Sequence, residues 1–246
     1  GKFEETRFEK IHNVVFDNSN IASIAVAQEI ANLIRTKQSE YKKCVLGLAT
    51  GSSPIKVYEE LVRMHEEEEL SFKNVVTFNL DEYYPMTKEN TQSYWYFMHE
   101  HLFNHVDILP ENINIPNGEV KPEEVHQFCI DYELKIKEAG GLDFQLLGIG
   151  RTGHIGFNEP GSHYNSGTRN ITLDHITRID AATAFLGIDH VPRVAITMGI
   201  GTIRKAKRIV LLAWGVNKAS VLRDTIEGEI TAEVPATYLQ RHENVT

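Results

Sequence analysis

The sequence predicts a doubly wound α/β fold, a Rossmann-like arrangement in which a mostly parallel sheet carries helices on both faces. Short apolar runs rich in β-branched residues alternate with helical patterns, which is typical of parallel strands joined by right-handed crossovers. The strand runs are apolar throughout, as expected where both faces of a sheet are covered. No Pro-, Gly- or Ser-rich linker divides the 246 residues, so one domain over 1–246 is expected.

The expected elements follow from local patterns along the chain. Apolar residues at helical spacing after the polar run Asn18-Ser19-Asn20 predict the first helix. Strands are expected at 14–16, 44–48, 75–79, 144–147, 194–198 and 209–213, where β-branched and apolar residues cluster. Helices are expected at 21–34, 54–67, 93–103, 123–139 and 217–227. The abrupt end at residues 242–246 leaves open that the chain is part of a longer polypeptide.

Composition narrows the classes of partner. The formal charge is −9 and no basic stretch is present, so nucleic acid is not an expected partner. No run approaches 18 apolar residues, so no membrane span is expected. Two cysteines, Cys44 and Cys129, do not make a disulfide framework, and a reducing, cytoplasmic location is the simpler interpretation.

Polar and glycine-rich segments follow four of the predicted strands. They occupy residues 49–54, 80–83, 148–160 and 214–218. In open α/β sheets, ligands bind beyond the carboxyl ends of the strands. Because four such segments can meet at one sheet edge, the sequence predicts a single ligand site there.

A phosphate cradle is predicted in the first of these segments, at Thr50, Gly51, Ser52 and Ser53. Gly51 lets the backbone approach an anion, Ser53 suits an N-cap, and the following helix start favours a dianion. Lys218 is a candidate cation for the same phosphate. An ordinary strand-to-helix turn and a surface lysine are the alternatives. Neither glycine loop fits a Walker motif or a dinucleotide fingerprint.

Acid–base chemistry is predicted at two further segments. Asp81 follows a strand directly and can move a proton at a sugar carbon, and His154 with Glu159 five residues on can open a pyranose ring. The alternatives are a capped loop with solvated acids and a structural histidine. No metal site is expected, because the neighbours of the three histidines at 99, 101 and 105 are not clear ligands.

Several segments together resemble the glucosamine-6-phosphate deaminase family. They cover nearly the whole chain, from about residue 14 to about residue 239. The matching segments are residues 46–54, similar to the phosphate loop, 76–83, similar to the catalytic-base segment, 153–160, similar to the ring-opening loop, and the shorter 93–98 and 112–114.

The resemblance implies conversion of glucosamine 6-phosphate and water to fructose 6-phosphate and ammonia, with no metal and no organic cofactor. It implies that Asp81 moves the proton between C2 and C1, and that His154 opens the ring, oriented by Glu159. It also implies homo-oligomers, often hexamers. An effector site is implied at Ser162, Arg169 and Thr172, although Ile171 stands where a lysine is usual.

Two departures from the family pattern concern the site. Thr152 stands where the family usually has an Asp of the His–carboxylate unit, which is expected to lower the pKa of His154. An Arg that binds phosphate is absent after Arg178, and Arg151 is the candidate replacement. These departures keep two alternatives open: a weakly catalytic sugar-phosphate-binding regulatory domain, and a hydrolase resembling 6-phosphogluconolactonase.

Overall fold

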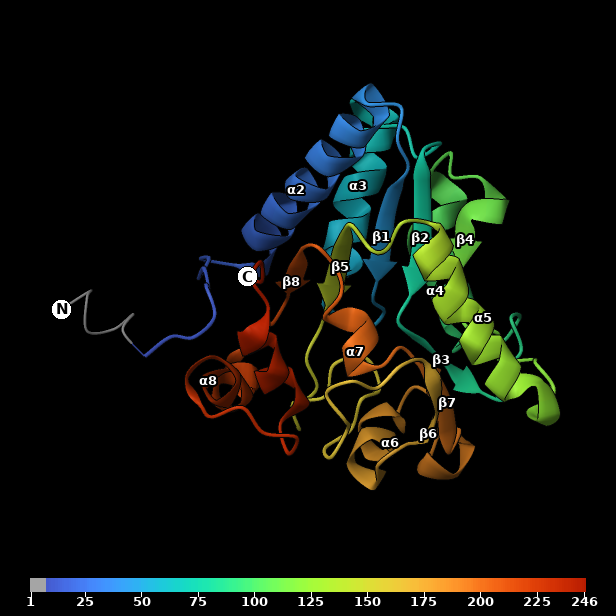
Figure 1. Ribbon diagram of the computed structural model, residues 1–246, viewed down its shortest axis with the longest axis vertical. Coiled ribbons are helices and arrows are strands. Elements are labelled where there is room, and N and C mark those ends of the chain that lie inside the picture. The colour runs from blue at the N-terminus through green and yellow to red at the C-terminus, as the bar shows by residue number, and fades with distance from the viewer. Residues whose placement is uncertain (1–7) are drawn as a thin grey trace.

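A computed structural model describes residues 8–246 and contains a five-stranded parallel sheet. The strand order is β4-β2-β1-β5-β8, and every neighbouring pair is parallel. Its strands are β1 (Cys44–Leu48), β2 (Val75–Asn79), β4 (Ile113–Asn114), β5 (Phe144–Leu147) and β8 (Ile209–Leu211). In Figure 1 the arrowhead of β1 points from the upper half of the molecule toward the lower half. The carboxyl ends of these strands therefore lie near the middle.

Helices cover both faces of this sheet, as the sequence predicts. Two apolar clusters lie on opposite faces: one packs α2, α3 and α4 on the sheet, and the other packs α5, α7 and α8. The helices are α2 (Ser19–Ser39), α3 (Ile55–Glu67), α4 (Tyr94–His101), α5 (Val125–Glu138), α6 (His175–Ala181), α7 (Ile200–Ile203) and α8 (Ala219–Glu227). Short 3-10 helices lie at Phe103–His105, Pro110–Asn112, Pro122–Glu124, Ile188–His190, Val216–Lys218 and Pro235–Arg241. The doubly wound fold class is confirmed.

A second, antiparallel sheet was not predicted. It has the order β3-β7-β6, with β3 (Asp81–Tyr84), β6 (Arg169–Thr172) and β7 (Val194–Thr197). The apolar run at 194–197 is a strand, but it joins this small sheet, where it is central and pairs on both sides. In Figure 1 this sheet lies with α6 below the parallel sheet. A run buried on both faces looks the same in either kind of sheet, so its apolar pattern could not reveal its partners.

The predicted first strand at residues 14–16 is wrong. The segment forms no strand, and Val15 is 92 % exposed. The free side of β8 pairs instead with the chain's last residues, through a parallel bridge between Ile209 and Val245. A β-rich run without a strand edge to pair with stays irregular. A cavity of about 760 Å³ lies between this segment, α2 and β8.

Among the helices within residues 8–246, none combines the length and apolar character needed to cross a lipid bilayer. Cys44 and Cys129 are buried and unpaired.

Candidate functional site

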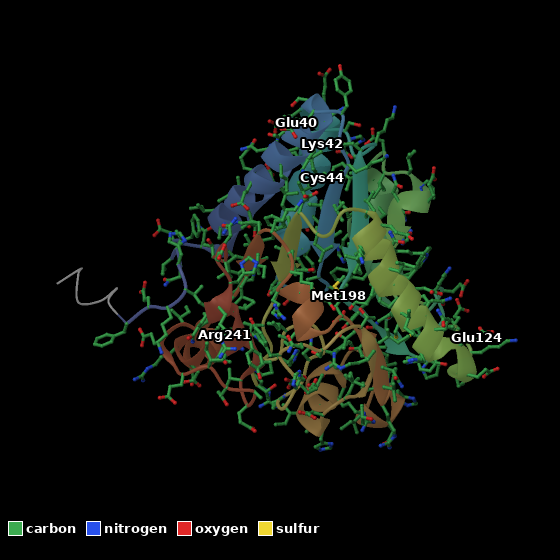
Figure 2. The ribbon with its side chains drawn as sticks, in the orientation of Figure 1. Glu40, Lys42, Cys44, Glu124, Met198 and Arg241 are labelled. Carbon is green, nitrogen blue, oxygen red and sulfur yellow. The ribbon has the colours of Figure 1, made fainter. Side chains whose placement is uncertain are left out.

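The site is built where the two sheets meet. The Leu80 N–H donates to the carbonyl of Leu48 at the end of β1, and the Met198 N–H donates to the carbonyl of Leu80. Figure 2 labels Met198 near the centre of the molecule, between the parallel sheet and the antiparallel sheet. These bonds hold the start of β3 against the carboxyl end of the parallel sheet. Asp81, the first residue of β3, is thereby placed at the edge predicted to bind ligand.

Asp81 is buried, with 6 % of its surface exposed, and lies beside the glycine loop. It pairs with Thr197 across β3 and β7. A Cβ atom built on Gly156 would stand 3.6 Å from Asp81 Oδ2 and 3.0 Å from Thr197 Oγ1. Burial, and then the neighbouring charge of Glu82, raise the pKa of Asp81 well above its ordinary value. A carboxylate desolvated in this way is a stronger base than a solvated one.

Glu82 has a different role from its neighbour. Its carboxylate accepts hydrogen bonds from the N–H groups of Tyr83, Tyr94 and Trp95, at 3.0, 2.9 and 3.0 Å. Two of these donors lie in the first turn of α4, where an anion is favoured by the unpaired N–H groups. Burial raises the pKa of Glu82 to about 7, while the three N–H donors act to lower it. Of the adjacent acids, Glu82 fixes α4 and Asp81 is free of such bonds.

His154 lies in the loop that follows β5, two residues before Gly156, the glycine that adjoins Asp81. Its Nδ1 is 2.8 Å from the carbonyl oxygen of Gly156, the glycine that adjoins the Asp81 carboxylate. Because a carbonyl only accepts, Nδ1 carries the proton and Nε2 keeps its lone pair in the neutral ring. Burial is the largest cause of a lowered His154 pKa, and the charge of Lys218 lowers it further. The structure thus places a neutral imidazole near a buried carboxylate.

The predicted phosphate loop reaches the same place through Tyr94. The Tyr94 ring packs on that of Tyr83, with 5.0 Å between the ring centroids, and the Thr50 side chain acts to lower the raised pKa of the Tyr94 hydroxyl. The expected N-cap role of Ser53 is wrong: α3 is capped by Pro54, without a side-chain cap bond. The Ser53 carbonyl instead accepts the Trp214 indole N–H at 3.0 Å. The loop is therefore bonded to the segment that follows β8.

Lys218 joins the site from the segment after β8. Its Nζ donates to the carbonyl of Ile149, in the glycine loop, at 2.6 Å. Burial lowers the pKa of Lys218, and the positive charge of Lys218 lowers the pKa of His154. The structure therefore brings together Lys218, His154, Asp81 and Thr50 from four separate strand ends. This is the convergence that the sequence predicts.

The backbone at the start of the phosphate loop is held by Tyr58 of α3. The Tyr58 hydroxyl donates to the Ala49 carbonyl at 2.5 Å and accepts the Ala49 N–H at 3.2 Å. We expect Tyr58→Phe to lower the free energy of unfolding by about 1–3 kcal/mol, because both buried backbone groups lose their partner. Urea titration checks this value. Tyr41→Phe is the control, since Tyr41 is 98 % exposed. Equal midpoints for the two variants would contradict the expectation.

Glu159 lies apart from its expected partner. The Thr177 hydroxyl lies 2.9 and 3.0 Å from the two carboxylate oxygens of Glu159. Burial and then Asp174 raise the pKa of Glu159 to about 8. His154 is bonded to Gly156 instead. The described geometry therefore differs from the expectation that Glu159 orients His154. The reason is that α6 packs its own hydroxyl and carboxyl groups against Glu159.

Two residues of the glycine loop depart from the family pattern. The hydroxyl of Thr152 is buried and has no hydrogen-bond partner. Arg151, the candidate replacement for a phosphate-binding Arg, forms an exposed ion pair with Asp180 at 2.9 Å. Arg151 is thereby turned to the surface, and it does not supply the missing cation in this structure.

The predicted effector residues are only partly gathered. Arg169 Nη1 donates to Asn158 Oδ1 at 2.9 Å, and Arg169 Nη2 lies 3.4 Å from Ser162 Oγ. Thr172 is three residues along the same strand and exposed. Because side chains alternate along a strand, Arg169 and Thr172 point to opposite faces of β6. Arg169 therefore contacts Asn158 and Ser162, on either side of Glu159, and Thr172 lies on the other face of the strand.

His99 of α4 and His105 of the following 3-10 helix bind backbone carbonyls. His99 Nδ1 donates to the Trp95 carbonyl, and His105 Nε2 to the Glu100 carbonyl. The part of the chain that the structure describes gathers no group of three His, Cys, Asp or Glu side chains that could hold a metal ion.

Tyr94, Thr197, Thr177 and Asp174 take part in the site, and the sequence analysis did not assign them a role. Their partners lie 11 to 116 residues away along the chain in the contacts described above. Such contacts are made by strand pairing and by the packing of α6, and no local spacing signals them.

Comparisons with known proteins show the family of the chain. The family described as "Glucosamine-6-phosphate isomerases/6-phosphogluconolactonase" matches residues 17–246. A Bacteroides thetaiotaomicron protein described as glucosamine-6-phosphate deaminase-like is 46 % identical over 239 residues, 97 % of this chain and 36 % of that protein. A glucosamine-6-phosphate deaminase of Clostridium botulinum is 47 % identical over 232 residues, covering 94 % and 91 % of the two chains.

A solved structure described as a monomeric glucosamine-6-phosphate deaminase superposes with a TM-score of 0.89. It is 42 % identical and covers 94 % of this chain and 93 % of its own. The chain thus spans about a third of one relative and nearly all of the others. The family match over residues 17–246 and relatives at 42–47 % identity agree with the observed fold. The chain belongs to the family of glucosamine-6-phosphate isomerases and 6-phosphogluconolactonases.

Proposed function

We propose that this chain converts glucosamine 6-phosphate and water to fructose 6-phosphate and ammonia. One observation carries the proposal: the loop around Gly156 brings the buried Asp81 carboxylate and the neutral His154 ring to one place. An aldose–ketose isomerisation needs one acid–base group that transfers a proton between the ring oxygens and another that transfers a proton between C2 and C1. The deaminase names of relatives at 46–47 % identity support the substrate.

Ring opening is the step assigned to His154. Its Nε2 lone pair accepts the proton of the O1 hydroxyl and returns it to O5 as the C1–O5 bond breaks, so that the imidazole ring is neutral again after the step. The lowered pKa of His154 favours this role, because the neutral ring is present at pH 7. The Gly156 carbonyl holds the Nδ1 proton, so the tautomer with a free Nε2 is fixed.

Proton transfer between C2 and C1 is assigned to Asp81. Its carboxylate takes the C2 proton to give an enolamine and returns a proton to C1. The resulting C2 imine adds water and releases ammonia. Desolvation strengthens Asp81 as a base, and Glu82 is committed to α4 and does not compete.

The phosphate is assigned to Thr50, Gly51, Ser52 and Ser53. Gly51 has φ +92°, in the region that favours glycine, and nothing stands within 4 Å of the Cβ position there. An anion can therefore approach the backbone. Lys218 supplies the positive charge, since Arg151 is held by Asp180. Thr152 contributes a hydroxyl where the family pattern has a carboxylate.

The test is an assay of the purified chain with glucosamine 6-phosphate, following ammonia and fructose 6-phosphate together. We expect equal amounts of both products. Glucose 6-phosphate serves as the matched substrate without an amine. Saturable binding without turnover would indicate a regulatory sugar-phosphate domain, and turnover of 6-phosphogluconolactone alone would indicate the lactonase reaction. Either result would overturn the proposal.

Lys218→Met is expected to raise KM for glucosamine 6-phosphate by about 10–100-fold, because a charge-assisted hydrogen bond is worth about 1.5–3 kcal/mol. The value of kcat should change less, since the phosphate lies away from C1 and C2. Initial-rate kinetics separate the two constants. Lys205→Met, at an exposed lysine, is the control. An unchanged KM would remove Lys218 from the phosphate site.

Three finer assignments belong to the same proposal. We propose a monomer, supported by the neighbour described as monomeric, in place of the hexamer that the resemblance implied. Sedimentation equilibrium checks this mass. Ser162 and Arg169 remain the proposed effector residues, and Thr172 is excluded from their cluster by its face of β6. The two free, buried cysteines support a reducing, cytoplasmic location.

A further inference from the structure

We propose that Asn158 is a positioning residue of this site, which fixes the loop carrying His154 beside Asp81. Thr197, at the end of β7, is its partner in this role. The inference rests on the proposed function, because it concerns how the two acid–base groups of that reaction are held together. The sequence pattern gives neither residue a role.

The Asn158 side chain is fully buried, and both ends of its amide are bonded. Its Nδ2 donates to the carbonyls of Ile155 and Met198, both at 2.8 Å. Its Oδ1 accepts from Arg169 Nη1 at 2.9 Å. Because a guanidinium only donates, Arg169 fixes which end of the amide faces the two carbonyls. Asn158 thereby joins the loop that carries His154 to the end of β7.

Thr197 holds the same loop from the strand. Its buried hydroxyl accepts the Phe157 N–H at 3.1 Å and donates to the Met198 carbonyl at 3.0 Å. The Met198 carbonyl therefore receives both the Thr197 hydroxyl and the Asn158 amide. Met198 is the residue labelled near the centre of the molecule in Figure 2. Two side chains, one from the loop and one from the strand, thus meet at one backbone group.

These two anchors lie on either side of Gly156. Ile155, whose carbonyl is bonded to Asn158, comes directly before it, and Phe157, whose N–H is bonded to Thr197, comes directly after it. A Cβ atom built on Gly156 would stand 3.4 Å from Asn158 Nδ2 and 3.0 Å from Thr197 Oγ1. Gly156 therefore cannot shift without breaking one of the two bonds.

Gly156 in turn sets the positions of the two acid–base groups. Its carbonyl holds His154 Nδ1 at 2.8 Å, and its Cβ position lies 3.6 Å from Asp81 Oδ2. The Met198 N–H donates at 2.7 Å to the carbonyl of Leu80, the residue before Asp81. Hydrogen bonds thus connect the His154 loop to the strand of Asp81 through Met198, and the amide at residue 158 makes the connection.

Asn158→Asp keeps the shape of the side chain and removes its two N–H donors. The new carboxylate is ionised beside Arg169 and faces the carbonyls of Ile155 and Met198, which repel it. We expect kcat for glucosamine 6-phosphate to fall about 100-fold, the effect of displacing a catalytic group by about 1 Å. KM should stay within about threefold, because the proposed phosphate residues belong to other strand ends.

The matched control is Asn104→Asp, the same chemical change at an exposed residue, which should leave both constants unaltered. Thr197→Val and Thr197→Ser separate positioning from packing. The valine keeps the volume and loses the hydroxyl, so kcat should fall about 10-fold or more. The serine keeps the hydroxyl and should remain within about threefold of the unchanged chain. A packing role alone gives the opposite order, because serine leaves a cavity and valine does not.

A measurement without substrate follows the His154 ring directly. Long-range ¹⁵N–¹H NMR of the histidine rings, assigned with His154→Gln, should show the unchanged chain with its proton on Nδ1. We expect Asn158→Asp and Thr197→Val to give a mixture of the two tautomers, because the Gly156 carbonyl no longer holds this proton. Thr197→Ser should keep the single tautomer.

Far-ultraviolet circular dichroism checks that each variant is folded. An unchanged kcat and an unchanged His154 tautomer in folded Asn158→Asp overturn the inference. If that variant does not fold, the Thr197 pair decides, and a valine variant as active as the serine variant contradicts the role. If the unchanged chain does not turn over the sugar, the proposed function fails, and the NMR spectra still show whether these residues hold His154.

Discussion

Asp81→Asn should lower kcat/KM for ammonia release from glucosamine 6-phosphate by about 10²–10⁴-fold, the usual contribution of a positioned acid–base group. The substitution keeps the shape of the side chain and removes the one group that can move a proton between C2 and C1. Because Asp81 is buried and its pKa is raised, removal of its charge should not destabilise the fold. The measurement is initial-rate kinetics, with the melting temperature recorded for each chain.

Asp131→Asn is the matched control for this substitution. Asp131 is an exposed residue of α5, so the same chemical change there should leave turnover unaltered. The wild-type rate in Asp81→Asn would show that another group carries the proton. A large fall in melting temperature would show that Asp81 supports the fold rather than the reaction.

The second large effect is expected at Gly150, where the backbone runs against the His154 ring. A Cβ atom at this position would stand 2.0 Å from His154 Nε2, so Gly150→Ala forces the imidazole to move. The displaced ring loses its bond to the Gly156 carbonyl, at a cost of about 1 kcal/mol. A displacement of a catalytic group by about 1 Å can lower kcat by about 100-fold. Steady-state kinetics and urea titration measure the two effects.

Gly148→Ala tests whether this outcome is specific. Gly148 lies two residues earlier in the same loop, and nothing stands within 4 Å of the Cβ position there. We expect Gly148→Ala to retain both activity and stability. If both alanine variants lose activity equally, then loop stiffness rather than the position of His154 controls the rate, and the role given to His154 is contradicted.

Much of the site could be predicted from short motifs. Gly51 follows β1, and the loop that carries His154 follows β5. In open parallel sheets, ligands bind at the loops that follow the carboxyl ends of the strands, so these loops could be identified from the sequence. The partners of these residues could not be predicted. The strand β3 that carries Asp81 pairs with β7 more than 100 residues later, and apolar runs of this kind fit either sheet.

The alternation of strands and helices, the parallel sheet and the polar segments at four strand ends could all be predicted from the chain's residues. These are local properties, set by apolar patterning and turn chemistry within a few residues. The packing of distant segments leaves residues 14–16 without a strand, places β7 in a second sheet, and bonds Glu159 to Thr177. Each of these depends on contacts between segments far apart in the chain, and local patterns of residues carry no information on which distant segment packs there.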